Sequence, residues 1–127
     1  MIIGLGTDLV EVGRMSKAYA KFGDRLCAKI LTDEELDKIR GNTGTIGQYL
    51  ASRFAAKEAA VKALGTGFSR GIGPKCVEIY SNAAGRPFLR FAGPALEFAQ
   101  GMNIGAIHLS ISHERSIAFA AVILEGM

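Results

Sequence analysis

Hydrophobic residues recur along the chain with two different periods, which indicates that it contains both strands and helices. Residues 2–9 alternate as a strand does and place Asp8 on the same face as Gly4 and Gly6. We expect this face, which the glycines leave nearly bare, to admit a ligand beside Asp8. The opposite face carries the apolar side chains Ile3, Leu5 and Leu9.

The helical period predicts three helices in the first half of the chain. The first covers residues 11–22 and ends at Gly23. The second begins at "LTDEEL", where Thr32 and Glu35 have the spacing of a capping box. After a loop predicted at 41–47, the third covers residues 48–64.

The second half of the chain reads mainly as strands, at residues 76–81, 86–91, 105–112 and 116–125, with one short helix near 94–100. One strand, then helices, then mostly strands predicts an α+β fold with a mostly antiparallel sheet packed with helices. No linker, repeat or change of composition interrupts the sequence, so we expect one domain over residues 1–127.

The composition of the chain limits the kinds of function that it can have. The net charge of +3 and pI of about 9.0 suggest an anionic ligand or an acidic partner. They fall short of the dense basic patch of a nucleic-acid-binding protein. No apolar stretch reaches the ~20 residues of a membrane helix. The start of the chain has no basic leader, so we expect a cytoplasmic protein.

The predicted helix at 48–64 carries charges in a sequence otherwise suited to burial. On a helical wheel Lys57 lies in the middle of the apolar arc, and Glu58 and Lys62 share the flank beside it. A helix ion pair contributes only ~0.2–0.5 kcal/mol, whereas desolvating a charge costs up to several kcal/mol. Stability therefore does not explain these charges, unless this flank simply faces water.

A carboxylate between two lysines suits Mg²⁺ bound to phosphate, because Mg²⁺ takes one or two carboxylates together with substrate phosphates. Glu58 is the first candidate ligand, and Asp8 is the second. The alternative for Asp8 is a turn or a helix N-cap. The glycine-rich segment "GTGFSRGIGPK" adds backbone N–H groups at Gly65 and Gly67 that could surround an anion.

Four segments together resemble the 4′-phosphopantetheinyl transferase superfamily in its short bacterial form. These segments are "GLGTDLVEVGR" at 4–14, "RFAAKEAAVKALGTG" at 53–67, "NAAGRP" at 82–87 and "SISHE" at 110–114. The second contains every fixed position of the family motif F-x-x-K-E-x-x-x-K-A-x-G-x-G. The resemblance covers nearly the whole chain and implies the superfamily's fold.

The resemblance implies a Mg²⁺-dependent enzyme of fatty acid biosynthesis. It would move the 4′-phosphopantetheine arm of coenzyme A to a serine of apo-acyl carrier protein and release adenosine 3′,5′-bisphosphate. Asp8 and Glu58 would hold the metal, and Glu58 and Lys62 would be catalytic. The residues implied for binding coenzyme A are Arg53, Lys57, Lys62, Gly65, Gly67, Ser112 and His113.

The resemblance also implies a homotrimer with sites between protomers, and a basic surface for the acidic carrier at Arg14, Lys21 and Arg25. Two general bases remain open: Glu58 acting through a metal-bound water, or His113 with Glu114. The competing functions are a small nucleic-acid-binding module, which would not explain Glu58 among the lysines, and a nucleotide-sensing domain that binds coenzyme A without turnover.

Overall fold

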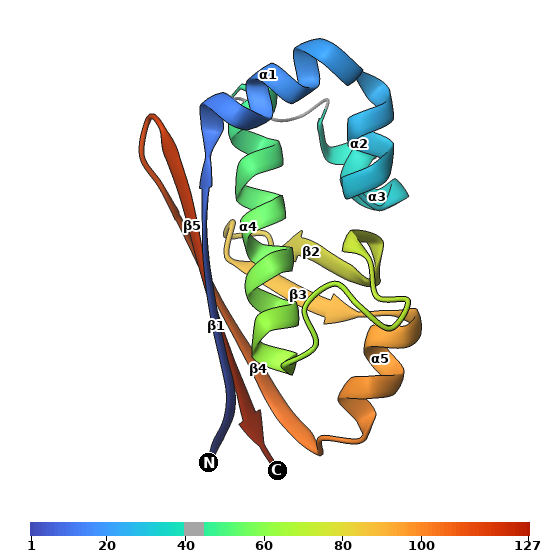
Figure 1. The fold of residues 1–127 in the computed structure, drawn as a ribbon. Helices are drawn as coiled ribbons and strands as arrows, with labels where there is room; N and C mark the ends of the chain where they lie inside the picture. The colour runs from blue at the N-terminus through green and yellow to red at the C-terminus, as the bar shows by residue number, and fades with distance from the viewer. Residues whose placement is uncertain (40–44) are drawn as a thin grey trace.

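The computed structural model describes residues 1–39 and 45–127, in which five α-helices accompany two antiparallel sheets (Figure 1). One sheet has the strand order β1-β5-β4, and β2 pairs with β3 in the other. In chain order the elements are β1 (Ile2–Glu11), α1 (Val12–Phe22), α2 (Asp24–Ile30), α3 (Asp33–Ile39), α4 (Ile46–Leu64), the 3₁₀ helix η1 (Pro74–Cys76), β2 (Val77–Ser81), β3 (Pro87–Phe91), α5 (Gly93–Gln100), β4 (Ile104–His113) and β5 (Ile117–Gly126).

The predicted α+β class is confirmed, with two differences in detail. The strands form two sheets instead of one. Helix α2 was not predicted: Gly23, with φ of 57°, ends α1 as expected, but a new helix begins at the next residue. The predicted loop at 41–47 falls mostly on residues 40–44, which lie outside the described part of the chain, and α4 already begins at Ile46.

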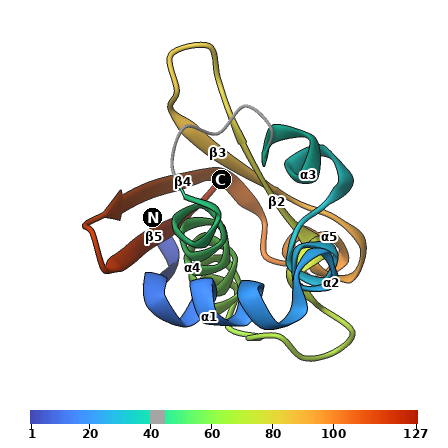
Figure 2. The ribbon, with the colours of Figure 1, turned by 90° about the horizontal axis from the view of Figure 1, so that it is seen from above.

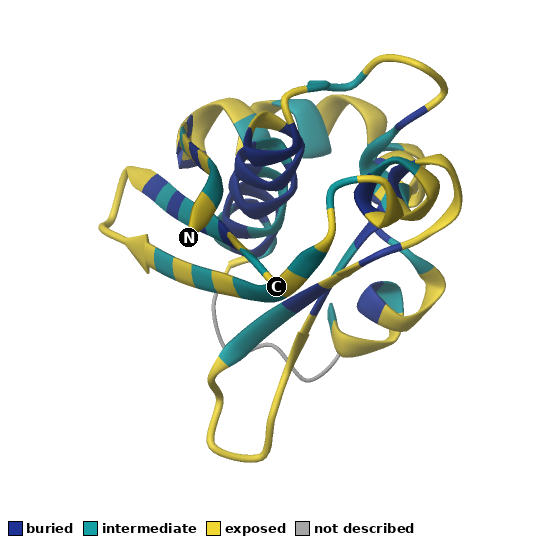
Figure 3. Cartoon of the chain, turned by 90° about the horizontal axis from the view of Figure 1, so that it is seen from below, coloured by how far each residue is buried: buried dark blue, intermediate teal, exposed yellow. Residues whose placement is uncertain are grey.

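Helix α4 is the centre of the molecule, and α1 crosses it on the side away from the sheet (Figure 2). It packs along β1 and β5, and nearly all of its turns are buried (Figure 3). Its small side chains allow this, because alanines at 55, 56, 59 and 60 are fully buried. The helix starts with Thr45 as N-cap, whose Oγ1 accepts the Gln48 backbone N–H at 3.1 Å.

The glycines of β1 serve this packing. A Cβ atom on Gly6 would lie 2.0 Å from the Ala59 carbonyl oxygen, and one on Gly4 would lie 2.3 Å from that of Ala63. The bare face therefore admits the backbone of α4, which corrects the expectation that it would admit a ligand. The close approach still matters for a site, because it brings Asp8 of the same face beside α4.

Replacing Gly6 by Ala is expected to lower the free energy of unfolding by at least ~1–3 kcal/mol, the usual cost of overpacking a core. The added methyl group meets backbone atoms, which cannot rotate away. Urea denaturation measures the loss. Gly13→Ala is the matched control, because a Cβ atom there has nothing within 4 Å. Equal stability of Gly6→Ala and the parent chain would contradict the close packing of β1 on α4.

No described element covers the face of the three-stranded sheet turned away from α4 (Figure 1). Leu5 and Leu9 on this face are 63% and 65% exposed. We call the residues of this face on β1 and β5 the open face; they are Leu5, Thr7, Leu9, Phe119, Ala121, Ile123 and Glu125. Among the helices the structure describes, none combines the length and the apolar character needed to cross a bilayer.

Candidate active site

Asp8 from β1 and Glu58 from α4 line one pocket of about 530 Å³, which we call the Asp8 pocket. The helix and the strand approach so closely here that residues distant in sequence meet at one opening. The other lining residues come from β1, α1, α2, α4 and η1: Leu9, Val10, Arg14, Met15, Ala18, Leu26, Lys29, Ile30, Phe54 and Pro74. The structure thus places the two carboxylates at a shared cavity that also carries basic and apolar side chains.

Lys62 lies beside these carboxylates. Its Nζ donates to Asp8 Oδ1 at 2.9 Å and to the Thr7 carbonyl oxygen at 3.1 Å. The lysine side chain is half exposed, whereas the Asp8 side chain is only 16% exposed. Lys62 could instead have formed an ion pair with Glu58 on the same helix. In the structure it pairs with Asp8. Within the described residues, the side chain of Glu58 makes no hydrogen bond or ion pair.

The pKa of Glu58 is raised because its carboxyl group is partly buried beside Asp8. Burial raises the pKa of Glu58, the negative charge of Asp8 raises it further, and Lys62 lowers it by less. Two neighbouring carboxylates oppose each other's ionisation, and a cation placed between them would remove this cost. The site therefore favours the binding of a positive ion.

The donor set suits Mg²⁺ better than zinc. Among residues 1–39 and 45–127, no cluster of three or more His, Cys, Asp or Glu side chains is placed to hold a metal. A structural zinc site would need four protein ligands. Magnesium needs only one or two carboxylates and completes its shell with water and substrate phosphates. Asp8 and Glu58 fit that requirement.

Lys57 has a different place from the one expected of a coenzyme A ligand. Its side chain is fully buried, and its Nζ donates to Glu35 Oε1 at 2.8 Å and to the carbonyl oxygens of Pro74 and Val77. All three ammonium protons are thus engaged inside the protein. Lys57 lines neither the Asp8 pocket nor the pocket around Arg53, so we assign it to the core, as a correction to the expected ligand contact.

Gly65 and Gly67 also differ from expectation. Gly65 has φ of 88° and ends α4, and the amides of Gly65 and Gly67 both donate to the Val61 carbonyl oxygen at 3.1 Å. This arrangement is a C-terminal cap, which glycine favours because it tolerates positive φ. The two amides are used to end the helix and do not face an anion.

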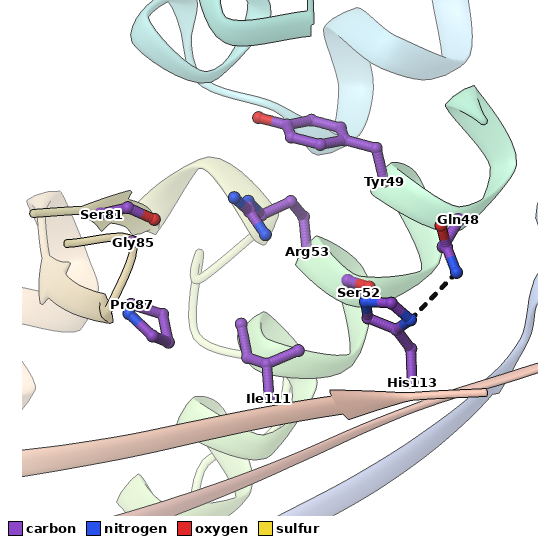
Figure 4. A pocket seen from close by; sticks show the side chains of 9 residues that line it. All are labelled: Gln48, Tyr49, Ser52, Arg53, Ser81, Gly85, Pro87, Ile111 and His113. Atoms are coloured by element: carbon purple, nitrogen blue, oxygen red, sulfur yellow. Dashed lines mark hydrogen bonds between the residues drawn. The ribbon is translucent and has the colours of Figure 1, made fainter. Parts of the chain in front are cut away.

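A second pocket, of about 240 Å³, lies beside the N-terminal turns of α4 (Figure 4). We call it the Arg53 pocket. The Arg53 guanidinium lies 4.6 Å from the centre of the Tyr49 ring, and its Nε is buried without a hydrogen-bond partner within the described residues. His113 lies across from it. The lining residues are Gln48, Tyr49, Ser52, Arg53, Ser81, Gly85, Pro87, Ile111 and His113.

The predicted site residues thus divide between two places. Arg53 and His113 share the Arg53 pocket, which has no lining residue in common with the Asp8 pocket. Ser112 precedes His113 on β4 and is exposed; because strand side chains alternate, it faces the opposite side of the sheet. One chain therefore does not gather all these residues into one site.

Of the predicted carrier contacts, Arg14 lines the Asp8 pocket, whereas Lys21 and Arg25 are exposed outside its lining. Lys29 lines the same pocket and was not expected from the sequence. Lys29 belongs to α2, the helix that the pattern did not predict. Gln48 and Tyr49 of the Arg53 pocket were missed as well, because nothing in the first turn of a helix distinguishes them from ordinary packing residues.

Comparisons with known proteins give a consistent result. The family model "4′-phosphopantetheinyl transferase superfamily" matches residues 4–120. The chain is 50% identical, over the full length of both, to a holo-[acyl-carrier-protein] synthase of Desulfovibrio desulfuricans. Among solved structures, the holo-[acyl-carrier-protein] synthase of Neisseria meningitidis is 39% identical with a TM-score of 0.89, covering 98% of this chain and 99% of that one. The synthase of Bacillus anthracis in complex with CoA (3′,5′-ADP) is 34% identical with a TM-score of 0.83, covering 100% of this chain and 99% of that one.

Proposed function

The chain belongs to the 4′-phosphopantetheinyl transferase superfamily, and we propose that its Asp8 pocket is where this family's reaction takes place, with Mg²⁺ held by Asp8 and Glu58. The protein transfers the 4′-phosphopantetheine arm of coenzyme A to a serine of apo-acyl carrier protein and releases adenosine 3′,5′-bisphosphate. The observation that supports the proposed location is the meeting of two carboxylates and Lys62 at one cavity.

Phosphoryl transfer asks little covalent chemistry of a protein and depends on positioning and charge neutralisation. Bound Mg²⁺ would neutralise and polarise the pyrophosphate of coenzyme A. Lys62 supplies a further positive charge beside Asp8, and its half-exposed side chain can turn toward a phosphate oxygen. We assign Lys62 to stabilising the charge that develops during transfer.

The carrier serine must lose a proton, and we propose that Glu58 accepts it through a water molecule. Glu58 lines the pocket in which the metal and the phosphates would bind, so a water molecule held there can pass the proton to it. The alternative pair would have to come from a neighbouring protomer, because His113 lines the Arg53 pocket and Glu114 is exposed in the turn after β4.

We propose that the Arg53 pocket takes the nucleotide end of coenzyme A. Arg53 offers a fixed cation next to an aromatic ring, at the lining of the pocket. Phosphate oxygens are the preferred partners of guanidinium groups. Since the two pockets are separate on one chain, a complete site would combine the Asp8 pocket of one protomer with the Arg53 pocket of another.

The open face gives such an assembly a surface. Exposed apolar patches on a small protein mark interaction sites, and Leu5 and Leu9 are more than 60% exposed. We propose that the protein is a homotrimer in which copies meet through this face, and that it acts in the cytoplasm.

Leu5→Asp is expected to convert the assembly to single chains. Light scattering after size exclusion should then fall from about three times the 13.5 kDa of one chain to that mass. Leu96→Asp is the control, because Leu96 is 43% exposed on α5, away from the open face. A parent chain that is already monomeric at micromolar concentration would contradict the proposed assembly.

Arg14→Glu is expected to raise KM for the carrier about tenfold or more while KM for coenzyme A changes little. Arg14 lines the Asp8 pocket, and acyl carrier proteins are acidic, so charge reversal replaces attraction by repulsion. Steady-state kinetics at low and high salt measure the effect, which should shrink as salt screens it. Lys17→Glu on the same helix, outside the lining, is the control. Equal effects of the two variants would contradict a specific role for Arg14.

The experiment that tests the proposed function is intact-mass analysis of apo-acyl carrier protein incubated with the protein, coenzyme A and Mg²⁺. We expect the carrier to gain the mass of one phosphopantetheine group. Chelation with EDTA should stop the gain, and added Mg²⁺ should restore it. The absence of a mass gain with several carriers would overturn the activity, whereas a gain that persists in EDTA would overturn only the metal.

A further inference from the structure

Two side chains from distant parts of the chain meet at the edge of the Arg53 pocket. The side-chain nitrogen Nε2 of Gln48 lies 3.0 Å from Nδ1 of His113 (Figure 4). Both backbones are fixed: Gln48 is in the first turn of α4, where its N–H bonds to Thr45 Oγ1, and His113 pairs with Ala118 in the sheet. The contact is therefore a defined feature of the pocket.

The chemistry of this contact fixes the protons of His113. With the Gln48 amide in this orientation, its nitrogen donates and Nδ1 of the imidazole accepts. A ring nitrogen that accepts carries no proton, and the neutral ring then carries its proton on Nε2. In Figure 4 this second nitrogen points away from Gln48, toward the interior of the pocket and the side where Arg53 lies.

We propose that Gln48 is a positioning residue that holds His113 as the Nε2–H tautomer, so that His113 donates a hydrogen bond to a phosphate oxygen of the nucleotide. The inference rests on the proposed function in one respect, the assignment of the Arg53 pocket to the nucleotide end of coenzyme A. Arg53 and His113 then present two donors toward one anion from α4 and β4.

The same tautomer excludes His113 as the general base. The lone pair of Nδ1 is taken by Gln48, and Nε2 already carries a proton. No ring nitrogen is left to accept the proton of the carrier serine. Gln48 therefore decides between the two bases that the sequence left open, and it favours Glu58.

The first test is spectroscopic and needs no substrate. Long-range ¹H–¹⁵N spectra separate protonated from unprotonated ring nitrogens, and His108→Gln leaves His113 as the only histidine. We expect Nδ1 unprotonated and Nε2 protonated in the neutral ring. In Gln48→Glu the carboxylate can only accept, so the proton should move to Nδ1. A protonated Nδ1 with Gln48 present, or unchanged spectra in Gln48→Glu, would overturn the proposal.

The second test is a kinetic double-mutant cycle. Gln48→Leu should raise KM for coenzyme A about tenfold, the value of about one hydrogen bond, without raising KM for the carrier. In a His113→Ala background Gln48→Leu should add nothing, because Gln48 acts through His113. Gln100→Leu on α5 is the control. Additive effects of the two substitutions would overturn the proposal, whereas loss of transfer in every variant and the parent chain would instead count against the proposed function.

Discussion

Replacing Glu58 by Gln is expected to reduce transfer of the phosphopantetheine arm by about 100-fold or more. Glutamine keeps the size of the side chain but supplies neither a negative ligand for Mg²⁺ nor a base for the carrier serine. Electrostatic stabilisation by a bound metal contributes several kcal/mol to a transition state, and each 1.36 kcal/mol is a factor of ten in rate. Intact-mass time courses of the carrier measure the loss directly.

The same substitution is expected to stabilise the protein at neutral pH. The folded-state pKa of Glu58 is raised, first by burial and then by the charge of Asp8. The folded chain thus binds this proton more tightly than the unfolded chain, and the resulting stabilisation is lost as the pH rises through the folded pKa. At neutral pH the ionised Glu58 costs stability, and Gln removes that cost.

The activity should also depend on pH, in the direction that the raised pKa of Glu58 predicts. At a limiting Mg²⁺ concentration, transfer should begin to fall, as the pH is lowered, at a higher pH than an ordinary glutamate would give, because protons compete with the metal for Glu58. Glu97→Gln on α5 is the control and should change neither quantity. A Glu58→Gln variant with full activity would contradict the metal assignment, and one that unfolds more easily than the parent would contradict the crowding of Glu58 by Asp8.

The sequence predicted that Asp8 and Glu58 lie together, and the structure places both at one pocket. The sequence pairs them because Asp8 ends a strand face that glycines clear, and Glu58 lies between two lysines on a helix suited to burial. The reason given for Asp8 was wrong in part, since Gly4 and Gly6 make room for α4 and not for a ligand. Glycines clear a strand face in the same way for a helix and for a substrate, so the sequence does not tell which of the two packs there.

Other features depend on contacts that no local pattern records. The capping box at Thr32 and Glu35 was predicted, and Thr32 N–H indeed donates to Glu35 Oε1 at 2.8 Å. The same carboxylate is also the partner of Lys57, twenty-two residues further along the chain. The wheel placed Lys57 correctly in the apolar arc, but its acceptors come from α3, η1 and β2 and became visible only in the folded chain.

Replacing Lys57 by Met is expected to cost about 3–5 kcal/mol of the free energy of unfolding, because it leaves the buried Glu35 carboxylate without its counter-charge. This is a large share of the ~5–15 kcal/mol by which a domain of this kind is stable. The Glu35 carboxylate also accepts N–H groups from Thr32 and Ile79, so it cannot easily leave the core. Urea denaturation at neutral pH measures the loss.

Lys62→Met is the matched control, since it makes the same substitution on the same helix. The ion pair of Lys62 with Asp8 is half exposed, and such pairs contribute ~0–1 kcal/mol. We expect Lys62→Met to lose activity with little loss of stability. Lys57→Met, assayed where it is still folded, should keep its KM for coenzyme A within about a factor of two. A KM that rises tenfold in Lys57→Met would restore Lys57 to the coenzyme A site.

The double variant Glu35→Gln with Lys57→Met separates the ion pair from the hydrogen bonds around it. Glutamine retains an oxygen that can accept the Ile79 or Thr32 N–H, and with Lys57 gone no charge is left without a partner. We therefore expect the double variant to be more stable than the sum of the single losses predicts, by ~1 kcal/mol or more. If the loss in the double variant equals the sum of the two single losses, the two charges do not depend on each other for stability. That result would contradict our explanation, in which each single variant is unstable because it leaves a buried charge without its partner.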